Sequence, residues 1–271
     1  MSFSQKITDL FTSNYLEVKN TIAFKIGDSQ YDATATYDIY LKKEKNQNFD
    51  VSIDRQKFKV NDQEIEDKFA SISNRYFNCL FPMCFNLEKD QLVATNFEAT
   101  NKRIAKVDTD LKNNMDGEGL EYISDQFLSQ TNSNEKIIAL IDSLAIVKIL
   151  NLALLRYEKK SNFNLTWTVP SVGKTFFKNI LKKEIPSDGI EYESNELDTT
   201  KFLDFLNQYH QENKLNLILN SPENKIFGTF RQNFKYANQG LRVTMAETEI
   251  KISLNDYLKF EETIILQSMI D

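Results

Sequence analysis

Alternation of apolar and polar residues is the strongest pattern in the first sixty residues. Between Tyr31 and Leu41 the odd positions carry mainly apolar side chains and the even positions mainly polar ones. The same period of two runs through the even positions from Leu16 to Ile26 and the odd positions from Phe49 to Ile53. This period is typical of half-buried strands, and short polar turns between the runs predict an antiparallel meander with one covered face. The phase changes around Arg55 to Lys57, which predicts a bulge or bend there.

A helical period replaces the alternation in the middle of the chain. Apolar residues recur at spacings of three and four over 64–78, 98–113 and 120–130, so these segments are predicted helices. A strand pair over 79–87 and 91–97, joined by a short polar turn, is predicted between the first two helices.

Glu135 to Tyr157 is the longest apolar run of the sequence. Its length and its Leu, Ile and Ala content predict one long helix, with Asn132 and Glu135 as an N-terminal capping pair. The run is long enough to cross a bilayer, but Asp142 and Lys148 near its middle would each cost about 2.5 to 3.5 kcal/mol there, so a buried helix outside a membrane is expected.

The polar residues of this run do not form one stripe. Asp142 and Ser143 lie nearly opposite Lys148 and Asn151 on a helical projection. A helix with two polar sides predicts neighbours on more than one side, so we expect it to form a spine between two β-rich parts. Its buried residues are then predicted to be Leu144, Leu150 and Leu154.

The last third of the sequence returns to strand signals. Phe163 to Val169 alternates until Pro170, and Asp198 is placed to cap an amphipathic helix containing Phe202, Phe205 and Leu206. The segment 173–184 fits a short helix as well as a strand. Further strands are predicted at 215–219, 226–236, 241–245, 250–254 and 260–266.

These elements predict an α+β fold with antiparallel β-meanders at both ends of the chain, packed around a central helical segment. The predicted division is an N-terminal β-rich lobe over 1–97, a central helical segment over 98–160 and a C-terminal β-rich lobe over 161–271, each lobe with one internal helix. One continuous domain is the alternative, because 7 Gly and 4 Pro in 271 residues leave no linker-like stretch.

Charge and cysteine content limit the function classes. The 33 basic and 39 acidic residues give a net charge of −6, an acidic balance that disfavours binding to nucleic acid. The first residues lack the apolar block of a secretory signal. Cys79 and Cys84 are five residues apart on a predicted strand, so their side chains are too distant and point to opposite faces, which excludes a disulfide between them. Two buried free thiols agree with a reducing compartment, so a soluble, cytoplasmic protein is expected.

Few residues carry metal or catalytic signals. One His and two Cys are too few for a zinc site, and no cofactor is predicted. Asn114, Asp116, Glu118 and Asp125 resemble positions one, three, five and twelve of a calcium loop, but Asn stands at the first position and the short Asp at the last. An acidic turn between helices is the expected interpretation, with a weak cation site as the alternative.

Aromatic residues are numerous, with 20 Phe, 11 Tyr and one Trp. Most alternate along strands and are expected in the core. If one sheet curves, Trp167 is the candidate residue for contact with an apolar ligand or a partner.

The function that these patterns favour is a non-catalytic protein-interaction or assembly protein, which binds another protein through an edge strand or an aromatic patch. The alternative is a carrier for a hydrophobic small molecule in a sheet-lined cavity, and the third reading is an enzyme with a dispersed site. A carrier requires an enclosed apolar cavity of a few hundred Å³, whereas an assembly protein requires an exposed patch or an unpaired sheet edge.

Overall fold

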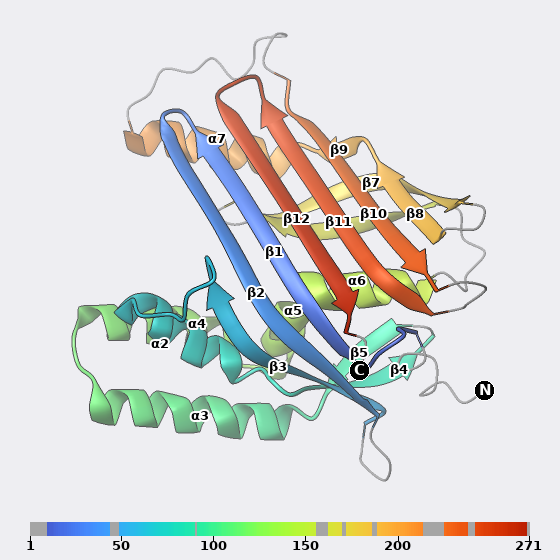
Figure 1. Ribbon diagram of the computed structural model, residues 1–271. Helices are drawn as coiled ribbons and strands as arrows, with labels where there is room; N and C mark the ends of the chain where they lie inside the picture. The colour runs from blue at the N-terminus through green and yellow to red at the C-terminus, as the bar shows by residue number, and fades with distance from the viewer. Residues whose placement is uncertain are drawn as a thin grey trace. The chain divides into compact units, whose positions relative to one another are not determined.

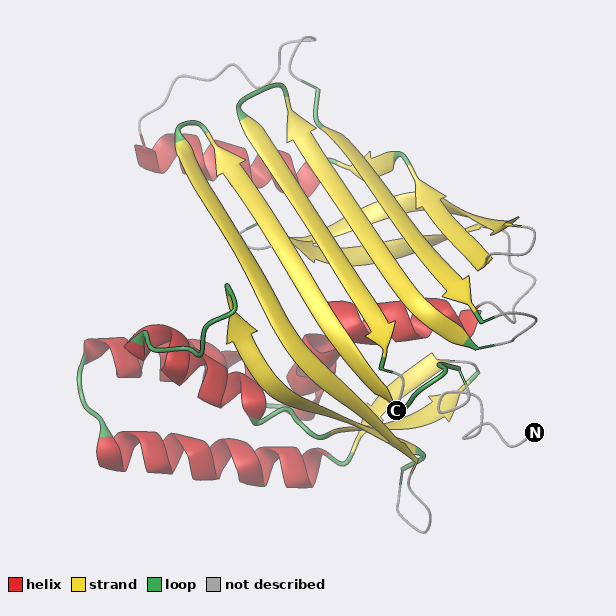
Figure 2. Cartoon of the chain, viewed as in Figure 1, coloured by secondary structure: helices red, strands yellow, loops and turns green. Residues whose placement is uncertain are grey.

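The computed structural model describes residues 10–43, 49–89, 91–155, 162–169, 172–185, 189–213, 225–237 and 242–269 (Figure 1). Its strands form an antiparallel sheet in the order β5-β4-β3-β2-β1-β12-β11-β10-β8-β7-β6, with β9 paired to β7 beside this path. Helices α2 to α6 follow one another in the middle of the chain, interrupted by the β4–β5 hairpin, and α7 lies in the last third (Figure 2). The predicted α+β class with antiparallel strands is therefore confirmed.

The chain forms two compact units, and each is described by itself. Unit 1 comprises residues 1–18, 35–155 and 268–271, and unit 2 comprises 19–34 and 156–267. The boundary crosses the long strands β1 (Tyr15–Ile26) and β2 (Ser29–Lys43) and the last residue of β12 (Leu258–Ser268). Most of the central helical segment thus belongs to the same unit as the N-terminal strands.

The strands of unit 1 follow the predicted meander. Besides its parts of β1 and β2, unit 1 contains β3 (Val51–Val60), β4 (Met83–Glu88) and β5 (Gln91–Thr95). The pairing of β2 with β3 shifts register between Thr36 and Asp38, and Lys57 on the facing strand has φ of 52°. The bulge predicted from the phase change near Arg55 to Lys57 is confirmed.

The strand predicted over 79–87 begins later than expected. Cys79 is the C-cap of α2 (Lys68–Asn78), and β4 starts only at Met83. Cys79 and Cys84 are both buried and are not joined by a disulfide, as expected.

The long apolar run is two helices rather than one. It forms α5 (Asn134–Ser143) and α6 (Ala145–Leu154), which meet at 74°, because Leu144 has extended backbone angles of φ −67° and ψ 130°. Ser133, not Asn132, is the N-cap, since its Oγ accepts a hydrogen bond from the Lys136 N–H. In the described part of the chain no single helix is long and apolar enough to cross a membrane, although α5 and α6 together meet that test by length and composition.

Burial along this segment follows the prediction only in part. Leu150 and Leu154 are fully buried, as expected, but Leu144 is only half-buried because it sits at the break, and Asp142 is exposed. α6 has eight buried residues of ten, including Lys148.

The remaining helices of unit 1 pack around a small core of their own. They are α2, α3 (Phe97–Asn114) and α4 (Glu118–Thr131). Their buried centre consists of Ile72, Tyr76, Leu111 and Leu120. Tyr76 donates a hydrogen bond to Asp108 Oδ1 at 2.6 Å, and burial together with this carboxylate raises the Tyr76 pKa to about 12.

Unit 2 contains the C-terminal strands. They are β6 (Asn162–Val169), β7 (Gly173–Ile185), β8 (Gly189–Ser194), β9 (Glu196–Asp198), β10 (Phe227–Tyr236), β11 (Val243–Leu254) and β12 (Leu258–Ser268, which ends in unit 1). The ambiguous segment 173–184 is thus a strand. The two strands predicted at 241–245 and 250–254 are the single strand β11. Its pairing with β10 shifts register opposite Lys235 and Tyr236, and this shift changes which positions of β11 face inwards without ending the strand. The strand predicted at 215–219 lies outside the described residues.

Helix α7 (Thr200–Asn213) packs on the sheet of unit 2, with Phe202 and Leu206 fully buried. Phe205 of this helix contacts Phe24 of β1, with ring centroids 6.5 Å apart. The predicted cap is displaced by one residue. Thr199 directly precedes the helix and its carbonyl accepts the hydrogen bond of the Leu203 N–H at 3.0 Å, whereas Asp198 ends β9 and its Oδ1 accepts a hydrogen bond from the Thr200 N–H at 3.1 Å. The face of the sheet that α7 covers is the apolar interior of unit 2.

Candidate partner-binding edge

Strand β6 has an inner and an outer face of different character. Its sequence, NFNLTWTV, places Trp167 and Val169 in the core, each with 1% exposure, while Thr166 and Thr168 on the other face are half-buried. β-branched and aromatic residues in alternation explain why this segment is extended. The strand contains no charged residue and no proline.

Strand β7 pairs with β6 through a bulge. The register shifts between Phe163 and Leu165, and opposite this point Asn179 has φ of 51°. Asn164 Oδ1 accepts a hydrogen bond from the Asn179 N–H at 3.1 Å, which holds the extra residue in place. Asn tolerates this left-handed conformation better than most residues, so the bulge has a local cause.

The bulge determines which apolar side chains of β7 face outwards. Phe177 and Ile180, three residues apart, are both fully buried, so the alternation changes phase between them. As a result Phe176, Leu181 and Ile185 share the outer face, with exposures of 42%, 49% and 40%. We call β6 together with these three side chains the β6–β7 surface.

Trp167 anchors β6 from the inner side. Its indole Nε1 donates a hydrogen bond to Glu262 Oε2 of β12 at 2.8 Å, and Asn20 of β1 donates to Glu262 Oε1 at 3.1 Å. The Trp167 ring also packs against Phe230, with centroids 6.0 Å apart. A partner at the β6 edge would therefore not touch the indole, and Trp167 holds the strand in position.

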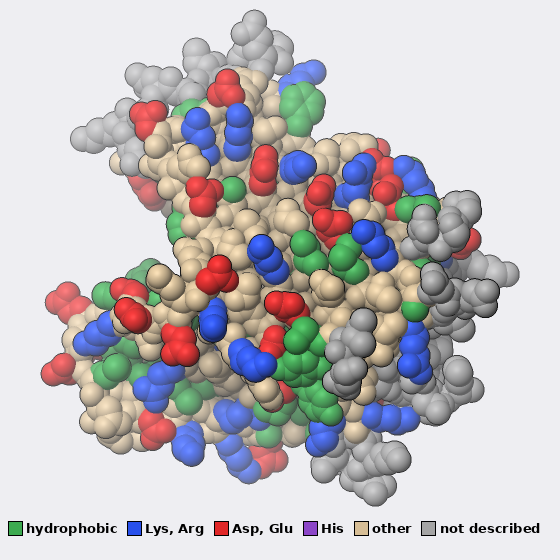
Figure 3. Space-filling view, viewed as in Figure 1, with side chains coloured by type: hydrophobic (Ala, Val, Ile, Leu, Met, Phe, Trp, Pro, Cys, Tyr) green, Lys and Arg blue, Asp and Glu red, His purple; other side chains and the backbone are tan. Residues whose placement is uncertain are grey.

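A group of ion pairs lies beside the C-terminal half of β7, at Lys183 between Leu181 and Ile185. Lys183 lies 3.8 Å from Glu191 and bonds Glu193, and this bond to Lys183 holds the Glu193 pKa below its usual range. Arg231 lies within 3.9 Å of the same two carboxylates. On the face seen in Figure 3, Lys and Arg side chains likewise alternate with Asp and Glu, without a large field of one sign.

The two ends of the strand order differ in how their edges are covered. At the β5 end, the Leu92 N–H donates to Asn151 Oδ1 of α6 at 2.8 Å, and α5 and α6 both contact β5. Within the described part of unit 2, β6 pairs with β7 alone. An uncharged strand with an unpaired edge is a template for a further strand.

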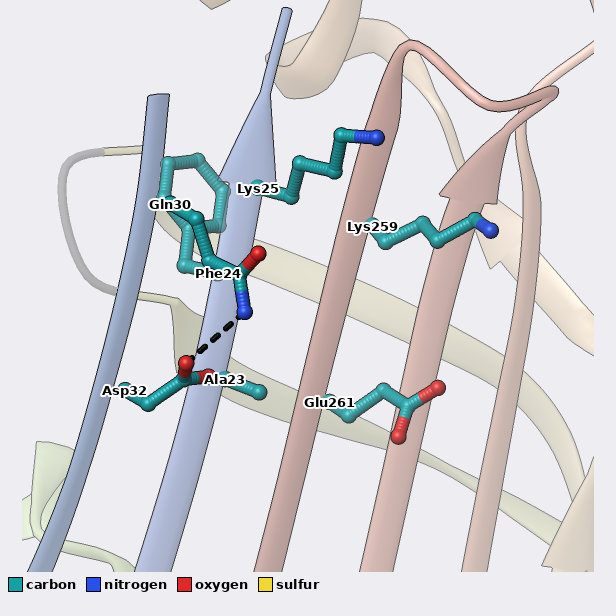
Figure 4. A pocket seen from close by; sticks show the side chains of 7 residues that line it. All are labelled: Ala23, Phe24, Lys25, Gln30, Asp32, Lys259 and Glu261. Atoms are coloured by element: carbon teal, nitrogen blue, oxygen red, sulfur yellow. Dashed lines mark hydrogen bonds between the residues drawn. The ribbon is translucent and has the colours of Figure 1, made fainter. Parts of the chain in front are cut away.

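A pocket of about 190 Å³ opens on unit 2 where β1, β2 and β12 run together (Figure 4). Four of its seven lining residues are charged: Lys25, Asp32, Lys259 and Glu261. Asp32 accepts a hydrogen bond from Gln30 Nε2 at 2.8 Å, and both residues belong to β2. This open, charged hollow differs from the enclosed apolar cavity that a carrier requires.

The four residues of the calcium-like fragment lie on or beside two helices. Asn114 ends α3 and donates to the Asp110 carbonyl, and Asp116 follows in the connection. Glu118 begins α4, so Asp125 is seven residues further along that helix, about 10 Å at 1.5 Å per residue. Among the described residues, no group of three or more His, Cys, Asp or Glu side chains is placed to hold a metal.

The outward positions of Phe176, Leu181 and Ile185 do not follow from the sequence pattern. Because the Asn179 bulge interrupts the alternation, the segment could be read as a helix, and the outward position of these side chains was hidden. A signal was present in the asparagines themselves, since Asn at positions 164 and 179 favours left-handed or bulged backbone.

No family model and no curated protein matches the sequence. Among solved structures, a chain titled "Lipid-protein interactions in lipovitellin" is similar, with a TM-score of 0.45 and 8% identity over 95% of the present chain. The matched part is 25% of that longer chain.

Proposed function

We propose that this protein is an assembly protein that binds a protein partner through the β6–β7 surface. The observation that carries the proposal is the edge of β6, an eight-residue strand without charge or proline that pairs with β7 alone in the described part of unit 2. An extended partner segment would hydrogen-bond to this edge as an added strand.

The neighbouring side chains fit the same role. Phe176, Leu181 and Ile185 offer apolar contacts on the outer face, and the ion pairs of Lys183 offer polar contacts next to Leu181 and Ile185. Protein interfaces usually combine apolar and polar contacts of this kind.

The experiment compares two variants in the cell that makes the protein. Tagged wild-type protein, Phe176→Lys/Leu181→Lys and Tyr31→Lys are isolated, and co-purifying proteins are identified by mass spectrometry. Tyr31 is the matched control, because it is an aromatic residue of unit 2 with 60% exposure, on β2.

We expect the double variant to lose the partner and Tyr31→Lys to keep it, because two lysines would desolvate poorly in an apolar interface. Circular dichroism and thermal unfolding of each variant verify that the fold is intact. Equal recovery of every protein partner with all three chains would refute the proposal. Recovery of a hydrophobic small molecule in place of any protein would favour a carrier.

A further inference from the structure

We infer that the segment which adds to β6 is β6 of a second copy of this chain, so that two sheets join edge to edge about a two-fold axis. This inference rests on the proposed function and specifies its partner.

The absence of charge on β6 favours pairing with itself. In a two-fold antiparallel pair, each residue meets its own symmetry mate or a residue of the same strand, so a charged strand would place like charges opposite each other. None of the 72 Lys, Arg, Asp and Glu residues of the chain lies between Asn162 and Val169. Self-pairing of β6 therefore carries no such repulsion.

The lysines of β7 lie too far from the axis to oppose the contact strongly. Two β7 strands would be separated by three strand spacings, about 14 Å, which exceeds the screening length of about 10 Å at 0.1 M salt. Lys178 is in addition paired with Asp198 at 3.1 Å.

The alternation of inward and outward residues along β6 restricts the register in which two β6 strands can pair. Residues opposite each other in an antiparallel pair lie on the same face, so inward residues must meet inward residues. An axis through Thr166 satisfies this condition, because it pairs Leu165 with Trp167 and Phe163 with Val169 of the second copy, all of them inward residues.

The outer face of this arrangement is also self-complementary. Thr166 meets its own mate, and Thr–Thr is a favourable cross-strand pair. Phe176 is the β7 partner of Thr166, so one Phe176 ring would flank the threonine pair on each side. These exposed rings would then border the contact between the copies.

The test combines cross-linking with sedimentation of the full chain. In Thr166→Cys the two new thiols would be opposite each other, with Cα atoms about 4.5 to 5.5 Å apart, within the range of a disulfide. Tyr31→Cys gives the background rate for an exposed cysteine of unit 2. The native thiols interfere little, since Cys79 and Cys84 are buried and burial raises the Cys79 pKa to about 11.

We expect Thr166→Cys to form a disulfide-linked dimer under mild oxidation at least about tenfold faster than Tyr31→Cys. Sedimentation equilibrium of the wild type should show a dimer, and Thr166→Lys should raise its dissociation constant about tenfold or more, because it places two lysines opposite each other. Thr166→Val, which keeps a β-branched residue, should remain dimeric.

A monomer at 100 µM, or a dimer whose Thr166→Cys form cross-links no faster than the control, would overturn the inference. The proposed function can still stand in that case, if another protein co-purifies with the wild type and is lost from Phe176→Lys/Leu181→Lys. If neither a second copy nor another protein depends on this surface, both proposals fail.

Discussion

Trp167 and Glu262, 95 residues apart in the chain, share a buried hydrogen bond of 2.8 Å between the indole N–H and one carboxylate oxygen. The bond links β6 to β12, and Asn20 of β1 donates to the other oxygen of the same carboxylate. A carboxylate with 5% exposure needs such donors, because an unsatisfied buried charge is costly. The position of β6 in unit 2 thus depends on a polar contact inside an aromatic core.

Replacing Trp167 by Phe removes this donor and leaves Glu262 Oε2 without it. We expect the free energy of unfolding, measured in urea, to fall by about 2 kcal/mol from the lost hydrogen bond, with a further loss from packing. The control is the same substitution in a Glu262→Leu background, where this hydrogen bond is absent, and the difference between the two losses gives the coupling free energy of the pair. Equal losses in both backgrounds would show that the hydrogen bond contributes nothing.

Gly228 of β10 lies against Leu197 of β9. A Cβ at position 228 would come within 2.6 Å of Leu197 Cδ2 and 2.7 Å of its Cβ. We therefore expect Gly228→Ala to lower the melting temperature and to destabilise the protein by about 1 to 3 kcal/mol through overpacking. Leu197→Ala should restore part of this loss in the double variant, and losses that simply add would contradict the contact.

Arg55 of β3 is surrounded by aromatic rings and amides. Its guanidinium carbon lies 4.5 Å from the Phe58 ring centre and 4.8 Å from that of Phe77, and it donates to Asn74 Oδ1 at 2.6 Å and also to Asn78 Oδ1. Burial lowers the Arg55 pKa to about 10.

Lysine at position 55 would keep the charge but could not stack its plane on the rings or reach both amides. Arg55→Lys should cost about 1 to 2 kcal/mol in chemical denaturation. Arg231→Lys is the matched control, because Arg231 is on a strand with only ion pairs of 3.8 to 3.9 Å, and it should change stability by less than about 0.5 kcal/mol. Equal effects would show that the aromatic surroundings of Arg55 do not matter.

Asp198, two residues before the first residue of α7, accepts a hydrogen bond from the Thr200 N–H through its carboxylate. Its hydrogen bonds with Thr200, followed by that with Lys178, lower the Asp198 pKa to about 2 from a usual value of 3.8. The folded state binds the proton of Asp198 more weakly than the unfolded state. The ionised carboxylate therefore stabilises the folded protein fully above about pH 4, and this stabilisation is lost as the pH falls towards 2.

Asp198→Asn retains an accepting oxygen and loses the charge, so it should be less stable than the wild type at pH 7. The difference should shrink between pH 4 and pH 2, as measured by urea unfolding at each pH. A difference that stays constant over this range would exclude the carboxylate charge as its source.

The sequence by itself determined the strands of the meander, the helices α2 to α4 and the bulge near Arg55, because a local period decides which side chains a strand or helix can bury. It also placed Asp198 beside the start of α7, since the start of a helix depends largely on neighbouring residues. The order of the strands required the tertiary structure, as β1 and β12 are adjacent although they lie at opposite ends of the chain.

Tertiary structure also decided the break at Leu144, because an apolar run of that length has no local signal that ends a helix in its middle. The outward position of Phe176 and Leu181 depended on one left-handed residue, Asn179, which the period of the sequence cannot place. The same is true of the partner of Trp167: an indole N–H in the core requires an acceptor, but only the folded sheet brings Glu262 to it.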